Sequence, residues 1–457
     1  MKEEMNLKNQ RILVLGAGIS GVAAYNLLEK IGAVPVLYDA NENLGIVGLQ
    51  ERLIGEENAR IILGALNEEV RKECDMLLVS PGVPLDTEIP LWFAANGKQI
   101  IGEIELAYLA GEGNIIAITG TNGKTTTTSL VGEIIKNYIG KVFVVGNIGI
   151  PYTEVCLQIE KGDPVVAEVS SFQLETIHAF HPCVSAILNI TPDHLNRHHT
   201  MENYTAAKKE VTRNQTEEDF CILNFDDERT RQIGREIRAK ACFFSVETEL
   251  DDGCFLRGDE IVFASNAEKK VLLCMQDMKL LGIHNAQNVM AAILMCHAFG
   301  IPMEDIVSSV KEFKAVEHRI EYVRTVKGVD YYNDSKGTNP DAAIKAVLAM
   351  NRPTVLIGGG YDKDNTYDEW IESFGNKVKA LILLGQTAEK IEACARAHGF
   401  EAIHRANDMK EVVEIAAELA CDGDAVLLSP ACASWGMFPN YEVRGKIFKE
   451  LVMALEE

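Results

Sequence analysis

The residues of this chain best suited to catalysis form a glycine-rich loop that directly follows the apolar, strand-like residues 115–118. In such a loop the backbone N–H groups and the N-terminus of the next helix cradle a polyphosphate. Lys124 would reach the β- and γ-phosphates, and the Thr125 hydroxyl would bind Mg²⁺. The commoner form has glycine at the position of Ile118, whereas here Gly120 lies inside the loop. The pattern predicts ATP binding by Gly120, Thr121, Asn122, Gly123, Lys124, Thr125 and Thr126.

A carboxylate, Glu168, stands at the end of a second apolar segment, residues 164–167. Two further segments, 143–145 and 186–188, also run into polar clusters. Because parallel strands end at one edge of a sheet, these clusters are expected to meet around the triphosphate. A carboxylate opposite a phosphate loop is a natural Mg²⁺ ligand, so we predict that Glu168 binds metal.

Two other polar residues carry weaker signals. His194 closes the cluster after residues 186–188, and a lone histidine at such a place is usually structural. Lys208 stands beside Lys209 on a helix predicted for residues 203–213. A charged helix face is normally solvated, so the pattern by itself predicts no role for Lys208.

Asn285 and Asn288 lie three positions apart, which places both carboxamides on one face of a helix. Side-chain amides suit the donor and acceptor edge of adenine. Asparagines that cap a helix would give the same pattern, so both interpretations stay open.

A second glycine turn, with the spacing G-x-G-x-x-G, joins the strand-like residues 11–15 to a helix that ends near Lys30. A further strand, residues 34–38, ends at Asp39. This order is typical of a dinucleotide-binding fold and, taken alone, predicts NAD. A nicotinamide-dependent oxidoreductase and a nucleotide-binding protein without turnover are therefore alternatives to an ATP-dependent enzyme.

The elements that position these residues alternate between strands and helices along the chain, which predicts an α/β fold with mostly parallel sheets. The length of 457 residues suggests about three domains. Residues 243–273 contain short β-like segments with glycine turns, as in an antiparallel edge. We predict a Rossmann-like first domain, a P-loop-type central domain and a Rossmann-like last domain, at residues 1–111, 112–316 and 317–457.

Composition excludes several classes of protein. The formal net charge of −23 disfavours a nucleic-acid partner held through phosphates. Eleven cysteines without regular spacing indicate reduced thiols rather than a disulfide framework or a zinc site. The N-terminal residues have no signal-peptide pattern, and no apolar stretch approaches the ~20 residues that span a bilayer. We expect a cytoplasmic monomer without membrane contact.

Taken together, the motifs resemble the Mur ligase family, the ATP-dependent amino-acid ligases of peptidoglycan synthesis. A phosphate loop without its first glycine is the family's own form. The resemblance spans nearly the whole chain and is most specific at residues 168–175 and 429–434. It points to the branch that joins D-glutamate to UDP-N-acetylmuramoyl-L-alanine, and these two runs argue against a sister ligase. The segments that carry it are residues 168–175, 193–197, 333–336 and 431–434.

The resemblance implies roles that the residues alone do not. ATP would also contact Asn285, Asn288, Arg319, Asp334 and Lys336. The catalytic residues would be Lys124, Glu168, His194 and Lys208. Two Mg²⁺ ions would be held by Thr125, Glu168, His194 and Lys208, with Lys208 carried as a carbamate. The glycine turn of the first domain would hold uridine diphosphate instead of NAD, so that the substrates would be bound by Ile19, Ser20, Asp39, Gly82, Asn147, His194, Thr338, Lys363, Ser434 and Tyr441.

The chain departs from the family pattern at four places. Asp39 is followed by Ala40 and Asn41, where a hydroxyl and a basic residue that help to hold uracil are expected. Glycine, tyrosine and glutamate stand at 337, 441 and 317, where alanine, phenylalanine and proline are expected. None of these changes removes a predicted ligand of phosphate, metal or amino acid.

Overall fold

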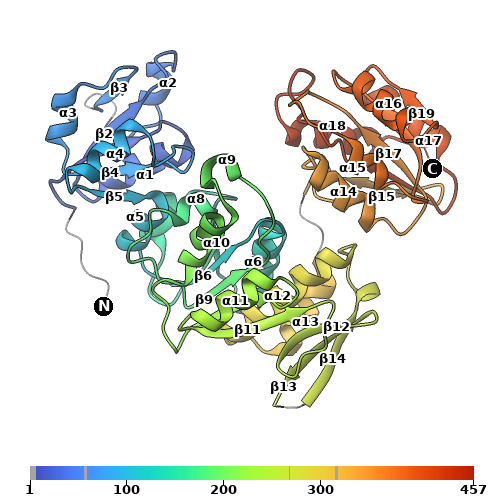
Figure 1. Ribbon diagram of the computed structural model, residues 1–457, viewed down its shortest axis with the longest axis horizontal. Coiled ribbons are helices and arrows are strands. Elements are labelled where there is room, and N and C mark those ends of the chain that lie inside the picture. Colours follow the sequence, from blue (N-terminus) through green and yellow to red (C-terminus); the bar gives the residue numbers. More distant parts are fainter. Residues whose placement is uncertain (1–6, 56–58, 267, 314–316, 457) are drawn as a thin grey trace. The chain divides into compact units, whose positions relative to one another are not determined.

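The computed structural model describes residues 7–55, 59–266, 268–313 and 317–456 (Figure 1). Within these ranges the strands form three sheets of five, nine and six strands. The chain divides into two compact units, one of residues 1–275 and 287–310 and the other of residues 276–286 and 311–457. The predicted α/β fold with mostly parallel sheets is confirmed.

The first sheet, blue to cyan in Figure 1, has the order β3-β2-β1-β4-β5 and is parallel throughout. Its central strands are buried on both faces, as continuous apolar runs require. The strands are β1 (Arg11–Leu15), β2 (Val34–Asp39), β3 (Ile61–Leu63), β4 (Met76–Val79) and β5 (Gln99–Gly102), and the helices are α1 (Ile19–Lys30), α2 (Ile46–Gln50), α3 (Glu68–Glu73), α4 (Glu88–Ala95) and α5 (Glu103–Ala110).

The central sheet has the order β14-β13-β12-β11-β10-β9-β6-β8-β7. It is parallel from β7 to β12 and antiparallel over β12, β13 and β14, which confirms the predicted antiparallel edge. Its strands are β6 (Asn114–Thr119), β7 (Phe143–Gly146), β8 (Pro164–Glu168), β9 (Val184–Ile187), β10 (Phe220–Asn224), β11 (Lys240–Ser245), β12 (Gly253–Arg257), β13 (Glu260–Ser265) and β14 (Glu268–Cys274).

Helices of very different length accompany this sheet. The longest are α6 and α12, each of 16 residues, and α6 starts directly at the glycine-rich loop. The helices are α6 (Lys124–Ile139), α7 (Tyr152–Val155), α8 (Ser171–Leu174), α9 (Leu195–His198), α10 (Met201–Lys209), α11 (Glu228–Glu236), α12 (Ile283–Ala298) and α13 (Met303–Glu312). The helix predicted for 203–213 thus starts earlier and ends at Lys209, followed by a 3₁₀ turn.

The third sheet, orange to red in Figure 1, has the order β15-β16-β20-β17-β18-β19, with β15 as an antiparallel edge. The remaining pairs are parallel. The elements are β15 (Glu321–Val326), β16 (Val329–Asn333), α14 (Pro340–Ala349), β17 (Thr354–Gly358), α15 (Asp368–Glu372), β18 (Val378–Leu383), α16 (Ala388–Ala397), β19 (Ile403–Arg405), α17 (Met409–Leu419), β20 (Ala425–Leu428) and α18 (Tyr441–Met453).

Two buried carboxylates on α5 connect the first sheet to the central one. Glu103 accepts hydrogen bonds from the Thr153 backbone N–H and hydroxyl, at 2.7 and 2.8 Å. Glu105 accepts from three successive backbone N–H groups, those of residues 178–180. Since a buried carboxylate is costly unless it is hydrogen-bonded, these contacts fix the first two sheets within one unit.

The predicted domain boundaries remain predictions. The division at 111/112 falls between α5 and β6, inside the first unit. The division at 316/317 touches residues 314–316, which lie outside the described residues. Residues 276–286, predicted as central domain, pack with the last unit. No helix in the described part of the chain is long and apolar enough to span a membrane.

Candidate active site

The glycine-rich loop connects β6 to α6 with two glycines in conformations that other residues rarely adopt. Gly120 has φ 146° and Gly123, the N-cap of α6, has φ 85°. A Cβ atom at Gly123 would lie 2.2 Å from the Asn288 Oδ1. The side chain of Asn288, on α12, therefore packs against the loop, and only glycine leaves room for it.

The loop is held in place by the residues that follow β9. The Asn122 backbone N–H donates to Asn189 Oδ1 at 2.8 Å, and Asn189 Nδ2 donates to the Asn122 carbonyl at 3.1 Å. The Thr121 N–H donates to the Asn189 carbonyl at 2.9 Å. Asn189 was not predicted as a site residue, although its place at the end of a strand next to β6 was a usable signal.

Two lysines converge on one carbonyl oxygen of the loop. Lys124 Nζ and Lys208 Nζ both donate to the Gly120 carbonyl, at 2.9 and 2.8 Å. Lys208 is 1% exposed, and burial, together with the positive charge of Lys124, holds its pKa well below the usual range for lysine. An uncharged amine is therefore accessible at this position at a lower pH than in a solvated lysine.

The expectation that Lys208 is solvated was wrong, whereas it holds for its neighbour. Lys209 is partly exposed and forms a 2.6 Å ion pair with Glu236. Tyr204 and Lys208 are one helical turn apart, so they share the face of α10 that is buried against the loop. The Tyr204 hydroxyl lies 3.2 Å from Thr121 Oγ1, and its ring lies 4.5 Å from Lys208 Nζ.

Glu168 ends β8 and is 1% exposed. It pairs in register with Ile118 of β6, which brings its carboxylate to the side of the loop. Asn147 Nδ2 donates to Glu168 Oε1 at 2.8 Å. Within the described residues Oε2 is buried and has no hydrogen-bond partner. A buried carboxylate oxygen of this kind fits a hard cation such as Mg²⁺, and Thr125, in the first turn of α6, offers a hydroxyl of the same donor type.

His194 has a left-handed backbone, with φ 51°, and is half exposed. Its ring lies 4.9 Å from that of Phe172 and 3.4 Å from the Asp193 carboxylate. His194 is thus placed next to the 168–175 motif with its side chain half exposed, so that a ligand could reach it.

The first glycine turn, at residues 16–21, is held in shape by close packing and by hydrogen bonds to Asp39. A Cβ atom at Gly21 would lie 1.8 Å from the Gly16 carbonyl, so that only glycine permits this approach of helix to turn. The Ala17 N–H donates to Asp39 Oδ2 and the Asn41 N–H to Asp39 Oδ1, both at 2.9 Å. Both carboxylate oxygens of Asp39 therefore accept hydrogen bonds from the backbone, and a bound nucleotide would have to share these acceptors.

The other residues predicted to bind the uridine-containing substrate lie at the surface of the first unit. Ile19, the first residue of α1, is 70% exposed, which is unusual for a large apolar side chain. Ser20 follows it, and Gly82 and Asn147 are exposed. A small cavity beside Gly82 is lined by residues from the loops and helices that accompany both sheets of the unit, among them Ser80, Glu103, Phe172, Gln173 and Arg197.

In the second unit, Asp334 is buried at the end of β16. Its Oδ2 accepts from the Ser429 hydroxyl at 2.6 Å, and its Oδ1 accepts from the Ile320 N–H at 3.3 Å. Burial raises the pKa of Asp334 to about 7, although its hydrogen bonds and the nearby Arg319 act in the opposite direction. Within the described residues the buried Nε of Arg319 has no hydrogen-bond partner.

The residues after β16 are packed against the start of α18. Lys336 Nζ lies 5.7 Å from the centre of the Tyr441 ring, and the Ser335 hydroxyl donates to the Tyr441 carbonyl at 2.8 Å. Thr338 is half-buried next to them. Asn285, on α12, donates from Nδ2 to the Leu281 carbonyl at 2.7 Å and is buried.

Lys363 and Ser434 lie on two loops that meet beyond β17 and β20. The Tyr361 N–H donates to the Ala433 carbonyl at 2.9 Å, and the rings of Tyr361 and Trp435 are 5.6 Å apart. Lys363 Nζ lies 4.8 Å from the centre of the Trp435 ring and is exposed, whereas Ser434 is buried. The structure thus brings these two predicted residues to one end of the third sheet.

Comparison with known proteins identifies the family. Three descriptions match in order: "Mur ligase MurD-like, N-terminal domain" at residues 10–102, "Mur ligase middle domain" at 118–296 and "Mur ligase, glutamate ligase domain" at 318–432. A relative from Lachnospira eligens, named UDP-N-acetylmuramoylalanine--D-glutamate ligase, is 55% identical over 448 residues, which cover 98% of this chain and 99% of the relative. The chain belongs to the Mur ligase family.

Other Mur ligases agree with this assignment. A relative of the same name from Clostridioides difficile is 46% identical and covers 99% of this chain and 100% of its own. Among solved structures, UDP-N-acetylmuramate-alanine ligase MurC from Thermotoga maritima aligns with a TM-score of 0.59 at 18% identity, over 97% of this chain and 99% of its own. At that identity the likeness concerns the fold alone.

Three residues of this chain that form several contacts near the predicted site residues were not themselves predicted as site residues. Arg197 donates to Glu175 at 2.6 Å and to the Pro81 carbonyl at 2.8 Å, and its guanidinium lies 4.1 Å from the centre of the Phe172 ring. His198 is buried, with Nε2 3.0 Å from the Ser171 hydroxyl. Arg444 is buried. Its guanidinium donates to the Ser335 hydroxyl at 2.9 Å, to the Ser335 carbonyl at 2.7 Å and to the Cys432 carbonyl at 3.1 Å.

Proposed function

We propose that this Mur ligase uses ATP to join D-glutamate to UDP-N-acetylmuramoyl-L-alanine through an acyl phosphate, a cytoplasmic step of peptidoglycan precursor synthesis. The near full-length likeness to relatives with that ligase name supports the choice of substrates. The observation that carries the use of ATP is the loop itself: two lysines meet at the Gly120 carbonyl beside a buried carboxylate oxygen that has no partner within the described residues.

In the first step the alanyl carboxylate of the nucleotide substrate attacks the γ-phosphate of ATP, the bond to the β,γ-bridging oxygen breaks, and ADP leaves. Lys124 and the backbone N–H groups of the loop neutralise the charge that develops on the phosphate oxygens. In this structure, Lys124 Nζ donates hydrogen bonds to the Gly120 and Thr121 carbonyls, both at 2.9 Å. A polyphosphate offers a charged partner in place of these neutral ones, so we propose that the ammonium turns from the carbonyls to the phosphates.

In the second step the amine of D-glutamate attacks the acyl phosphate, and inorganic phosphate leaves from the tetrahedral intermediate. We assign Lys363 to a carboxylate of D-glutamate, Ser434 to a hydrogen bond with it, and Thr338 and Tyr441 to the lining of that pocket. Asn285, Asn288, Arg319, Asp334 and Lys336 are assigned to ATP. Every assigned residue comes from one chain, and we propose that the enzyme acts as a monomer.

Two Mg²⁺ ions fit the oxygen and nitrogen donors of the first unit. Thr125 and Glu168 would hold one, and His194 and Lys208 the other. When bound, Mg²⁺ supplies positive charge to phosphate oxygens. Lys208 can take part only after it loses its own charge, and we propose that its uncharged amine adds to CO₂, forms a carbamate and releases a proton to solvent. The lowered pKa supports this proposal, because only an uncharged amine adds to CO₂.

The first glycine turn is assigned to the uridine diphosphate part of the substrate, through Ile19, Ser20, Asp39 and Gly82, together with Asn147. Because both Asp39 oxygens already accept backbone N–H groups, we expect Asp39 to fix the shape of the turn as well as to contact the ligand.

Phosphate release from ATP in the presence of UDP-N-acetylmuramoyl-L-alanine tests the proposal, with D-glutamate, L-glutamate, L-alanine and diaminopimelate offered separately. Release only with D-glutamate is expected. Release with another amino acid would leave the ligase chemistry and overturn the assignment of D-glutamate. No release with any of them would favour a nucleotide-binding protein without turnover.

A further inference from the structure

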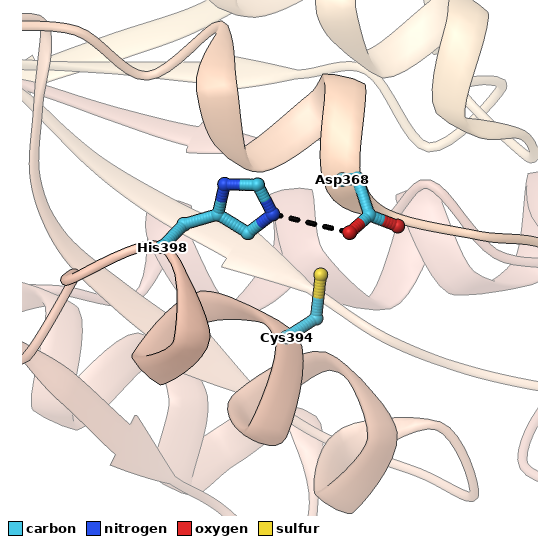
Figure 2. A group of neighbouring side chains, drawn as sticks. All are labelled: Asp368, Cys394 and His398. Carbon is cyan, nitrogen blue, oxygen red and sulfur yellow. Dashed lines mark hydrogen bonds and ion pairs between the residues drawn. The ribbon is translucent and has the colours of Figure 1, made fainter.

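A cluster of side chains suited to metal binding lies in the second unit and shares no residue with the sets assigned to ATP and D-glutamate. Asp368 starts α15, Cys394 lies on α16, and His398 caps the end of α16 (Figure 2). The carboxylate, thiol and imidazole each offer one ligand atom, and these atoms all lie within 4.8 Å of one another. We propose that Asp368, Cys394 and His398 form a binding site for Zn²⁺ or a similar borderline divalent cation.

The positions of the three residues follow from helical geometry. Cys394 and His398 are four residues apart, so one turn of helix presents both on the same side. Asp368 comes from α15, which packs against α16. Figure 2 shows the Cys394 sulfur directed toward the space between the imidazole ring and the carboxylate. Two elements thus supply a pair of ligands and a third ligand that faces the pair.

The ligand atoms lie close to the spacing that tetrahedral coordination requires. Zinc bonds of about 2.0–2.3 Å hold neighbouring ligand atoms about 3.3–3.8 Å apart. His398 Nε2 already lies 3.1 Å from Asp368 Oδ1. Binding would replace the proton between these two atoms by the cation and would release the thiol proton to solvent. The fourth position is left for water.

A fourth residue is placed to orient the histidine. Glu372 lies one turn after Asp368 on α15, and its Oε1 is 3.7 Å from His398 Nδ1. In metal sites the nitrogen of histidine that does not bind the ion commonly donates to a carboxylate, which fixes the tautomer. In the bound state Nδ1 would carry the proton toward Glu372 and Nε2 would face the cation.

Two alternatives fit less well: the same three residues as a cysteine-nucleophile site, and a second acid–histidine cluster as the cation site. A cysteine nucleophile would need the histidine as its base, but His398 Nε2 is directed to Asp368. The other acid–histidine cluster of the described chain, Glu317, His318 and Glu321, already holds a cation: Lys449 Nζ lies 2.5 and 2.9 Å from its two glutamates.

Titration of the full-length protein with Co²⁺ tests the site, because Co²⁺ bound to a thiolate gives a charge-transfer absorption in the near ultraviolet. We expect this absorption to saturate at one ion per chain and to be displaced by Zn²⁺. The Mg²⁺ ligands assigned in the first unit include no thiol, so they cannot give this signal. Absence of the absorption in the native protein would overturn the proposal.

Variants make the assignment specific. Cys394→Ser is expected to abolish the absorption, whereas Cys421→Ser, at an exposed cysteine of the same unit, should leave it unchanged. Glu372→Gln should weaken Co²⁺ binding about tenfold. Circular dichroism checks that each variant is folded. An equal absorption in Cys394→Ser would overturn the site, and an unchanged affinity in Glu372→Gln would overturn the role of Glu372. Neither result depends on ligase activity.

Discussion

The phosphate loop of the first unit and the Lys363–Ser434 region of the second both place a lysine at the end of a parallel sheet, but the two lysines are held very differently. Lys124 donates to two backbone carbonyls and shares one of them with the buried Lys208. Lys363 is exposed and lies over the Trp435 ring.

The difference concerns the cost of holding charge before any ligand is bound. In the loop region, the Lys208 amine and the Glu168 carboxylate are buried, and within the described residues Glu168 Oε2 has no hydrogen-bond partner, an arrangement that is unfavourable until a polyphosphate and cations arrive. The Lys363 side chain remains solvated, so its charge costs little free energy in the protein without ligand. Substitutions in the loop should therefore affect the chemical step, and substitutions around Lys363 should affect affinity.

The largest effect is expected for Lys124→Ala. Loss of the only loop lysine removes the charge that stabilises the transferring phosphoryl group, so D-glutamate-dependent phosphate release should fall about 10³-fold or more. Steady-state phosphate release measures this, with a thermal melt to show that the loop variant is folded. Near-normal ATP consumption would contradict the assignment of the loop.

Lys208→Ala and Lys209→Ala form a matched pair on one helix. Removal of the buried lysine should reduce phosphate release about 10²-fold or more, and removal of the exposed one should leave it close to the wild-type rate. Formate or acetate should restore part of the activity of Lys208→Ala, because a short carboxylate can replace a carbamate. Loss of activity without any rescue by carboxylates or bicarbonate would remove the support for the carbamate.

Lys363→Ala tests the exposed side of the comparison. Since a hydrogen bond to a charged group contributes about 1.5–3 kcal/mol, the apparent KM for D-glutamate should rise roughly 10- to 100-fold with a smaller change in kcat. Lys390→Ala is the control, because Lys390 forms an ion pair with Asp362 near the same loop and has no assigned ligand. An unchanged KM would place the amino-acid pocket elsewhere.

The last prediction concerns stability instead of activity and uses Asp334→Asn. The pKa of Asp334 is raised to about 7 in the folded protein, above its usual value near 3.9 in an unfolded chain. The folded state then binds more protons than the unfolded state, so this group makes the protein less stable as the pH rises from about 4 to about 7.

The asparagine variant lacks this titration. Its free energy of unfolding should therefore gain on that of the wild type across the same pH range. Denaturant titrations at both ends of the range, followed by tryptophan fluorescence, measure the gain; two of the three tryptophans, Trp370 and Trp435, report on the second unit. A gain that is independent of pH would be incompatible with a buried, titrating Asp334.

Much of the fold was predictable because each motif fixes its own backbone. The apolar runs before Gly16, Gly120 and Glu168 are strands, and the glycine turns after the first two lead into helices, as predicted. Glycine spacing, apolar periodicity and polar residues at strand ends depend on neighbours within a few positions, so the sequence by itself determined the α/β class, the mostly parallel sheets and the phosphate loop.

Tertiary structure decided which side chains lose contact with water. Lys208 and Lys209 are alike in sequence, and only the packing of α10 against the loop buries the first and leaves the second in solvent. The same is true of Asn189 and of the cluster at Asp368, where two separate helices bring a thiol, an imidazole and a carboxylate together. Burial and charge depend on elements far apart along the chain, and a local pattern contains no information about which elements will meet.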